Sequence, residues 1–352
     1  MIRLFRKRGN WLTNCPTTFK RIHRAIFFGV CLTLAASFLT FGIPSVAEAD
    51  GVAEIAMELT QGTILHGKNI DQRLPMASTT KIMTALIVSE ECDLDEVIAV
   101  PDEAVGVEGS SIYLKKGENI SVKDLLYGLM LRSGNDAACA LAIYHSGSIE
   151  KFVERMNGRA GELGAKDTHF ANPSGLPDEE HYTTARDLCN ITRHAMSNPV
   201  FAQVVSAKDY SGEYRFFTNK NKLLNTLDGA NGVKTGYTQK AGRCLVSSVK
   251  RGDMDVVCVV LNCYDMWQRS QSIIENCFNE YANETISADR IFTFRGEQCK
   301  LDKDYTVTVK KNGELKFEIC EVKDRQDRAA VAKLEIYCEN DLIFSHNLYT
   351  IN

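Results

Sequence analysis

The apolar positions of this 352-residue chain change their spacing along the sequence, and the pattern predicts a protein of the α+β class. Five apolar or amphipathic segments are each long enough for several turns of α-helix. These segments are residues 78–90, 122–144, 148–163, 185–196 and 267–281. The polar residues Arg132–Asn135 interrupt the second segment, so we expect the helix to break there.

Segments that predict β-strands lie at both ends of the region 50–283. Near its start, short apolar runs flank the turn Thr60–Gly62 and predict a β-hairpin. Further runs follow Asn231. The predicted strands are residues 54–58, 63–66, 232–237, 243–249 and 254–261. We therefore expect a helical cluster packed on an antiparallel sheet to which both ends of the region contribute.

After Ser287 the pattern changes to short alternating runs separated by polar turns. These runs predict strands over residues 305–309, 315–319 and 332–337. They indicate a small all-β module, a sandwich, over residues 288–352. A chain of this length can form both domains.

The first 49 residues have the composition of a targeting segment. Residues 1–24 hold seven basic side chains and no acidic one, and an apolar run from residue 25 to about residue 43 follows. The small residues Ser45–Ala49 predict a signal peptide, residues 1–49, that is cleaved after Ala49. Because the apolar run is rather long, an uncleaved N-terminal anchor is the alternative. Either way, we expect the chain from Asp50 onward to be exported.

Removal of this leader leaves an acidic chain. The whole sequence has 41 basic and 45 acidic residues. The leader takes seven basic residues and one acidic residue, which leaves 34 against 44 and a net charge of −10. Such a charge disfavours nucleic-acid binding.

Ten cysteines remain after the leader, none in a C-x-x-C motif. Several of them, such as Cys258 in the run Val256–Val260, stand where core residues would. We expect mostly reduced, buried thiols, with one or two disulfides as the alternative. A zinc site formed by cysteines and histidines is a weaker alternative, because the histidines are scattered and lack the spacing of metal ligands.

Ser78 and Lys81 form an S-x-x-K motif at the start of the first predicted helix. Three residues apart on a helix, their side chains share one face and meet. A desolvated lysine near another cation has a lowered pKa and can accept the proton of a serine hydroxyl. The N–H of Ser78 at the helix start could bind a developing oxyanion. A helix cap followed by a surface lysine is the alternative, which the apolar residues 82–88 disfavour.

Ser133 and Asn135 form an S-x-N motif in the polar break of the second helix. A hydroxyl there can relay a proton between Lys81 and a leaving amine, and the amide can hold a peptide carbonyl. A turn that caps a helix would use the same residues, and for this motif alone that alternative is favoured.

The segment Lys234–Tyr237 contains a K-T-G motif on a predicted strand. The amine of Lys234 and the hydroxyl of Thr235 suit a terminal carboxylate. Gly236 allows a substrate to approach the backbone, and the N–H of Tyr237 could complete an oxyanion hole. A lysine at an exposed strand edge is the alternative. The three motifs together, in this order, are far more specific than any one of them.

With these motifs, the chain resembles the serine-type D-Ala-D-Ala carboxypeptidases, the low-molecular-mass penicillin-binding proteins. The resemblance includes further blocks, at residues 75–86, 109–114, 131–138, 168–176, 182–188 and 228–246. It covers nearly all of residues 50–283, and residues 288–349 look like the small C-terminal β-domain of the family. It implies a β-lactamase/transpeptidase-like catalytic domain followed by a β-sandwich.

The resemblance also implies a mechanism on peptidoglycan stem peptides. Ser78 would attack the carbonyl of the penultimate D-Ala with Lys81 as general base, and Asn135 would orient the substrate. Ser133 and Lys234 would shuttle protons and bind the terminal carboxylate. β-Lactam antibiotics would acylate Ser78 by the same route, and no metal or other cofactor is implied.

The resemblance places the protein at the extracytoplasmic face of the bacterial cell envelope, either secreted or membrane-associated. Family members often end in an amphipathic helix that holds them on the membrane. This sequence stops after its last predicted strand. We therefore expect it either to leave the membrane on cleavage or to use residues 25–47 as its anchor.

Two alternatives of other kinds remain. A class A-type β-lactamase shares the motifs but needs a carboxylate to activate the deacylating water. The segment Thr168–Pro177 holds no acidic residue, although Glu162, Asp167 and Asp178 flank it. The other alternative is a non-catalytic peptidoglycan-binding protein. Such a protein usually lacks one of the reactive side chains, and all of them are present here.

Overall fold

The structure is a computed structural model that describes residues 51–213, 215–322 and 329–351. The predicted leader, residues 1–49, lies outside the described residues. Within those ranges, no helix is both long and apolar enough to cross a membrane.

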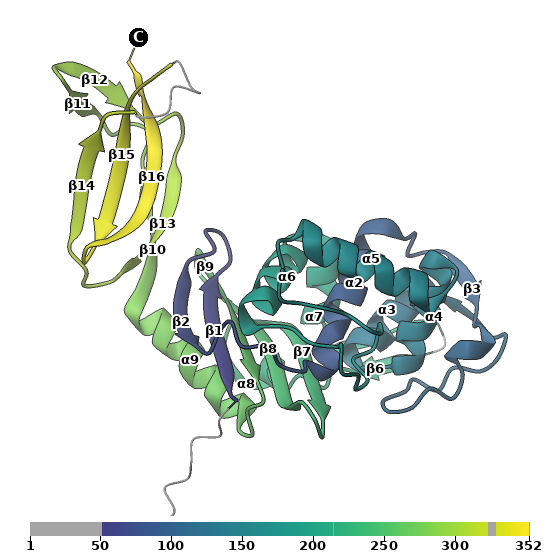
Figure 1. The fold of residues 1–352 in the computed structure, drawn as a ribbon. Helices are drawn as coiled ribbons and strands as arrows, with labels where there is room; N and C mark the ends of the chain where they lie inside the picture. Colours follow the sequence, from purple (N-terminus) through teal and green to yellow (C-terminus); the bar gives the residue numbers. More distant parts are fainter. Residues whose placement is uncertain (1–50, 214, 323–328, 352) are drawn as a thin grey trace, which may run out of the picture. The chain divides into compact units, whose positions relative to one another are not determined.

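A five-stranded antiparallel sheet in the order β2-β1-β9-β8-β7 forms the centre of the larger domain (Figure 1). Its strands come from both ends of this domain, as predicted, and Ile55 of the first strand pairs with Val259 of the last. The strands are β1 (Ala53–Glu58), β2 (Ile64–Lys68), β7 (Ala230–Thr238), β8 (Gly242–Arg251) and β9 (Met254–Leu261).

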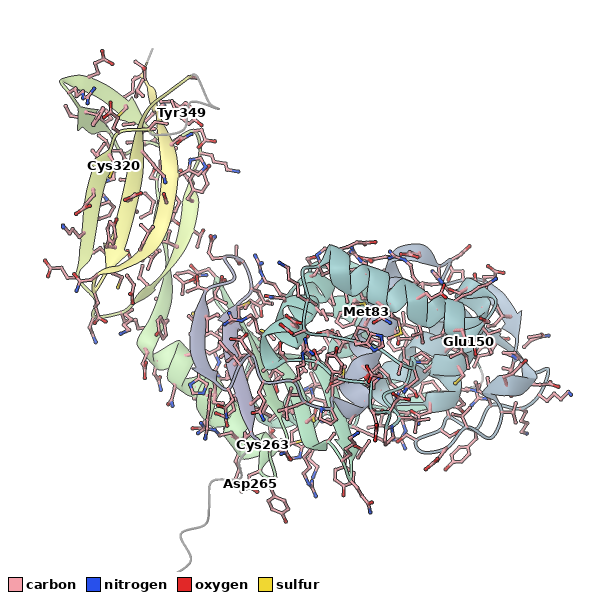
Figure 2. The ribbon with its side chains drawn as sticks, viewed as in Figure 1. Met83, Glu150, Cys263, Asp265, Cys320 and Tyr349 are labelled. Carbon is pink, nitrogen blue, oxygen red and sulfur yellow. The ribbon has the colours of Figure 1, made fainter. Side chains whose placement is uncertain are left out.

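Helices cover both faces of this sheet (Figure 1). Along β9, Val257 and Val259 pack into the core beneath the main helical cluster, while Cys258 and Val260 pack toward α9. A strand that is buried on both faces explains the uninterrupted apolar run in the sequence. Met83, labelled in Figure 2, is 1% exposed inside the helical cluster.

The predicted helices are present, and the predicted break occurs between α3 and α4. The α-helices are α2 (Lys81–Glu91), α3 (Val122–Leu131), α4 (Asn135–Ser146), α5 (Ile149–Glu162), α6 (Ala185–Ser197), α7 (Pro199–Ser206), α8 (Leu223–Thr226) and α9 (Met266–Glu280). Sequence analysis missed the short helix α8 and also α7, which begins at Pro199 after the capping side chain of Asn198. It also missed the short elements η1 (Ala77–Thr80), η2 (Asp102–Ala104), β3 (Val97–Ala99), β4 (Asn119–Ser121), β5 (Asp209–Ser211) and β6 (Phe216–Thr218).

The C-terminal part is all β and has a core of its own, as expected. A two-stranded sheet pairs β10 with β13, and a five-stranded sheet has the order β11-β12-β16-β15-β14. The strands are β10 (Tyr281–Ile286), β11 (Phe292–Phe294), β12 (Glu297–Lys300), β13 (Tyr305–Lys310), β14 (Leu315–Cys320), β15 (Ala330–Cys338) and β16 (Asp341–Thr350). The ten cysteines of the described residues are free thiols, and eight of them are buried.

Candidate active site

Ser78 lies in the 3₁₀ turn η1, directly before α2. The sequence predicts Ser78 and Lys81 on one α-helix, whereas the α-helix begins only at Lys81. The two side chains still face each other, because residues three apart are aligned in a 3₁₀ turn. The distance from Lys81 Nζ to Ser78 Oγ is 3.2 Å. Ala77, just before Ser78, has a left-handed φ of 48°, a conformation that its surroundings must enforce.

Lys81 is fully buried and has three polar neighbours. Besides Ser78, its Nζ atom lies 2.6 Å from Asn135 Oδ1 and 2.5 Å from the carbonyl oxygen of Ser174. These two oxygens only accept hydrogen bonds, so a neutral amine would donate both of its protons to them. Its lone pair is then left for the hydroxyl proton of Ser78. The arrangement suits a general base that activates a serine nucleophile.

Burial and neighbouring cations favour the neutral form of this amine. Burial, followed by the charge of Lys234, holds the pKa of Lys81 well below its usual range. Burial and then the charge of Lys220 lower the pKa of Lys234 to about 7. The pKa of Lys220 is itself lowered, by burial and then by Arg132. The charges of Lys234 and Lys220 near Lys81 suit a ligand with a negative charge.

Ser133 and Asn135 lie at the break between α3 and α4. Ser133 is 5% exposed and has a left-handed φ of 64°. The amide of Asn135 is oriented at both ends, because Nδ2 donates to the carbonyl of Glu108 at 2.6 Å while Oδ1 faces Lys81. Among the described residues, no hydrogen bond joins the Ser133 hydroxyl to Lys81 or Lys234. The structure therefore brings Asn135, but not Ser133, into direct contact with the base candidate.

The K-T-G motif lies on β7, which passes along the turn that holds Ser78. A Cβ atom at Gly236 would lie 3.2 Å from the backbone nitrogen of Ser78, which shows how close the strand comes. Lys234 is buried, and its Nζ donates to the carbonyl of Thr235 at 2.9 Å. Thr235 is partly exposed, and Tyr237 is largely exposed. The motif thus forms one wall beside Ser78.

A second wall is the loop of residues 168–177, which contacts the site through backbone atoms. Gly175 has a φ of 87°, and a Cβ atom there would lie only 2.0 Å from the carbonyl oxygen of Ala77. Only glycine permits this approach. The acidic residues that flank the loop have other partners: Glu162 pairs with Arg155 and Arg159, Asp167 pairs with Arg73, and Asp178 accepts from the backbone N–H of Glu180.

Sequence analysis missed His181 and Thr80, whose side chains hold the 3₁₀ turn through hydrogen bonds. His181 is 3% exposed, and its Nδ1 accepts the backbone N–H of Ala171 at 3.0 Å. The proton is therefore on Nε2, which lies 2.6 Å from Thr80 Oγ1. The Thr80 hydroxyl in turn donates to the carbonyl of Ala77 at 2.8 Å. Burial lowers the pKa of His181 to about 4, so its imidazole is neutral at ordinary pH.

Asp136 is a further residue that sequence analysis missed. Asn135, the residue before it, donates its backbone N–H to the carbonyl of Ser110 at 2.7 Å, so the loop around Ser110 borders the site. The buried carboxylate of Asp136 accepts several hydrogen bonds, most of them from this loop. Its donors are the Ser111 hydroxyl and the backbone N–H groups of Ile112, Leu114 and Ala137. One carboxylate thus fixes the loop beside Asn135.

Outside this site, one group of side chains in the described part of the chain has the ligand types of a metal site. Ligand atoms of Glu318, Cys320 and Glu335 lie within 4.8 Å of one another in the C-terminal part. The two carboxylates already have partners, because Lys316 pairs with Glu318, and the Tyr337 hydroxyl donates to Glu335 at 2.8 Å.

The chain is similar in sequence and in structure to known proteins. The sequence profile of D-alanyl-D-alanine carboxypeptidases matches residues 42–265. The D-alanyl-D-alanine carboxypeptidase DacF of Bacillus subtilis is 34% identical over 290 residues, which are 76% of this chain and 73% of that protein. Two crystal structures each align with a TM-score of 0.73. One is the D-alanyl-D-alanine carboxypeptidase DacD of Francisella tularensis, which is 29% identical, with 88% of this chain and 94% of that protein aligned. The other is penicillin binding protein 5 of Haemophilus influenzae, which is 26% identical, with 85% of this chain and 96% of that protein aligned.

Proposed function

Because this chain belongs to the D-alanyl-D-alanine carboxypeptidase family, we propose that Ser78 is the nucleophile of its carboxypeptidase reaction. The protein is a serine-type hydrolase that removes a terminal D-Ala, and it is a penicillin-binding protein. The observation that supports the role of Ser78 most directly is the 3.2 Å contact between its Oγ and the buried Nζ of Lys81. A serine hydroxyl needs such a base, because it is a weak nucleophile by itself.

In the proposed reaction, Ser78 Oγ attacks the carbonyl carbon of the penultimate D-Ala of a stem peptide while its proton passes to Lys81. The N–H groups of Ser78 and Tyr237 stabilise the oxyanion. Ser133 relays the proton from Lys81 to the departing nitrogen, the C–N bond breaks, and terminal D-Ala leaves. Water then attacks the acyl-serine ester while Lys81 takes its proton. The bond between the acyl carbon and Ser78 Oγ breaks, Oγ receives the proton from Lys81, and the shortened peptide is released.

Substrate binding is proposed for the other motif residues. Lys234 and Thr235 bind the carboxylate of the terminal D-Ala, which the positive charge nearby favours. Gly236 admits the peptide to the edge of β7, and Asn135 orients it through an amide that is already fixed at both ends. These roles need no cofactor.

β-Lactams acylate Ser78 by the same attack, and we propose that this ester is hydrolysed slowly. The loop 168–177 presents the carbonyl of Ser174 to Lys81, where a rapid β-lactamase would need a carboxylate to activate water. Among the described residues, no carboxylate forms a hydrogen bond with Ser78 or Lys81.

We also propose limits for the two domains and a location for the protein. Residues 50–283 form the catalytic domain and residues 288–352 the β-sandwich domain. Residues 1–49 direct export to the extracytoplasmic face of the envelope, with residues 25–47 as the membrane anchor if the leader is not cleaved. Fractionation of cells, followed by the N-terminal sequence of the protein from membrane and medium, tests the location and the cleavage of the leader. An N-terminus at Asp50 in the medium supports cleavage, and Met1 in the membrane supports the anchor.

Incubation of the purified full-length protein with benzylpenicillin, followed by intact mass and peptide mapping, tests the role of Ser78. The same protein is assayed for D-Ala release from an acylated Lys-D-Ala-D-Ala peptide. A lasting adduct on Ser78 together with D-Ala release supports the proposal. Rapid penicillin hydrolysis without an adduct would favour the β-lactamase, and neither activity in a folded protein would favour a binding protein.

A further inference from the structure

A hollow of about 390 Å³ includes Arg132, the residue before Ser133, and nothing in the proposed reaction uses it. Arg132 contributes one wall, and the loop that Asp136 holds contributes another. We call this feature the Arg132 hollow. Its lining residues are Ser111, Ile112, Tyr113, Arg132, Arg215, Phe216, Phe217 and Thr218.

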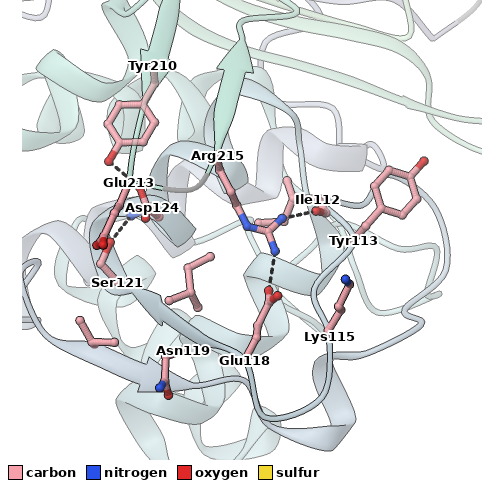
Figure 3. A pocket seen from close by; sticks show the side chains of 12 residues that line it. Ile112, Tyr113, Lys115, Glu118, Asn119, Ser121, Asp124, Tyr210, Glu213 and Arg215 are labelled. Atoms are coloured by element: carbon pink, nitrogen blue, oxygen red, sulfur yellow. Dashed lines mark hydrogen bonds and ion pairs between the residues drawn. The ribbon is translucent and has the colours of Figure 1, made fainter.

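Two arginines line this hollow, and Arg132 is the one that has no acidic partner among the described residues. Its side chain is exposed, and its one hydrogen bond is a long one, from Nη1 to the carbonyl of Thr218 at 3.4 Å. Within the described ranges, no carboxylate pairs with it. The neighbouring Arg215 is different, because it binds Glu118 and the carbonyl of Ile112 (Figure 3). A guanidinium with most of its donors unused can bind a carboxylate in a bidentate manner.

Two exposed aromatic side chains complete the hollow. Tyr113 is 82% exposed and Phe216 is 66% exposed. Tyr113 has a left-handed φ of 61°, and its ring points away from Glu118 in Figure 3. Exposed aromatic surface beside an unpaired arginine is typical of sites that bind peptides. The chain beyond the leader carries a net charge of −10, which disfavours anions, whereas an arginine without an acidic partner gives local complementarity to one.

We propose that the Arg132 hollow binds a free carboxylate that the acyl-donor peptide carries on its N-terminal side, away from the scissile bond. This inference rests on the proposed carboxypeptidase function and adds a specificity to it. The side chain of Arg132 forms an ion pair with the carboxylate, and Tyr113 and Phe216 contact the adjoining peptide chain. The protein therefore distinguishes a donor peptide with this carboxylate from one in which it is an amide.

The test uses two synthetic peptides, acetyl-γ-D-Glu-Lys(acetyl)-D-Ala-D-Ala with the glutamyl α-carboxyl group either free or amidated. D-Ala release by the full-length protein is measured as kcat/KM. We expect the free acid to be preferred by about two- to fivefold, mainly through KM, which is the range of an exposed ion pair. The preference should decrease in high salt, because exposed charges are screened.

Three variants make the test specific. Arg132→Gln should remove the preference, and Arg132→Lys, which keeps the charge, should restore part of it. Lys151→Gln, which removes an exposed cation from α5, should leave the preference intact. Equal use of the two peptides by the unaltered protein, or an undiminished preference in Arg132→Gln, would overturn the inference while leaving the carboxypeptidase function standing. No D-Ala release from either peptide would instead overturn the proposed function, and this inference with it.

Discussion

The imidazole Nε2 of His181 lies 2.6 Å from the hydroxyl of Thr80, behind the turn that carries Ser78. The hydroxyl of Thr80 in turn donates a hydrogen bond to the carbonyl of Ala77, the residue with the left-handed φ. These two hydrogen bonds thus orient the backbone next to Ser78, and neither of them involves a substrate. Both His181 and Thr80 act as positioning residues in this arrangement.

We therefore expect His181→Phe and Thr80→Val to slow penicillin acylation by about tenfold or more, because small displacements of a nucleophile are costly. The second-order acylation rate and the kcat and KM for D-Ala release are the measurements. A positioning role predicts a lower kcat with a similar KM. His181→Gln, which can still donate to Thr80, should recover part of the rate. Variants that are less stable but acylate at the normal rate would contradict this role.

Ser78→Ala should abolish covalent labelling by benzylpenicillin and leave the fold intact. The Ser78 side chain is partly exposed, and the contact it loses is the one to Lys81. Intact mass measures the adduct, and circular dichroism with thermal unfolding checks the fold. Ser133→Ala serves as a comparison, because it retains the nucleophile and should still be labelled, at a reduced rate. An adduct on the Ser78→Ala protein would rule out Ser78 as the acylated residue.

The pH dependence of kcat/KM should reflect two lysines that must be in opposite protonation states for activity. Lys81 must be neutral, so activity rises as pH passes its strongly lowered pKa. Lys234 must be charged to bind the terminal carboxylate, so activity falls as pH rises above about 7. In Lys234→Arg the alkaline limb should move to higher pH, because a guanidinium keeps its proton. An alkaline limb that stays in place would assign that limb to another group.

Lys234→Met should stabilise the protein while it impairs substrate binding. The pKa of Lys234 is about 7 in the folded state, against an unfolded value of about 10.4. The unfolded state therefore binds more protons between these values, and the buried amine lowers the free energy of unfolding below pH 7 by at most about 5 kcal/mol. Thermal unfolding at pH 6 should show a higher Tm for the variant. The difference should shrink at about pH 9.5, and an opposite trend would contradict the assignment.

Gly175→Ala should disrupt the site more than its backbone conformation alone explains. A Cβ atom there would lie 2.0 Å from the carbonyl oxygen of Ala77, so the loop or the nucleophile turn must move. Gly164→Ala is a matched control, because Gly164 also has a positive φ, 73°, but nothing lies within 4 Å of its added Cβ. The control should lose about 1–2 kcal/mol of stability and keep its acylation rate. Equal effects of the two substitutions would show that the close contact is unimportant.

The amino-acid sequence alone was sufficient to predict the two-domain α+β architecture and the positions of the three motifs. The break at Arg132–Asn135 could be predicted because three polar residues and a glycine interrupt a continuous apolar segment. The strands at the two ends of the larger domain could be predicted from their apolar runs and turns. The 3₁₀ turn at Ser78 could not, since an i, i+3 spacing fits that turn as well as an α-helix.

Only the tertiary structure decided what surrounds each motif residue. The carbonyl of Ser174, the amide of Asn135 and the charge of Lys234 come from separate segments, and together they control the amine of Lys81. The support from His181 likewise depends on a contact across a long stretch of sequence. A motif specifies which chemical groups are present, whereas burial and neighbouring charges, which depend on the fold, determine their pKa values and orientation.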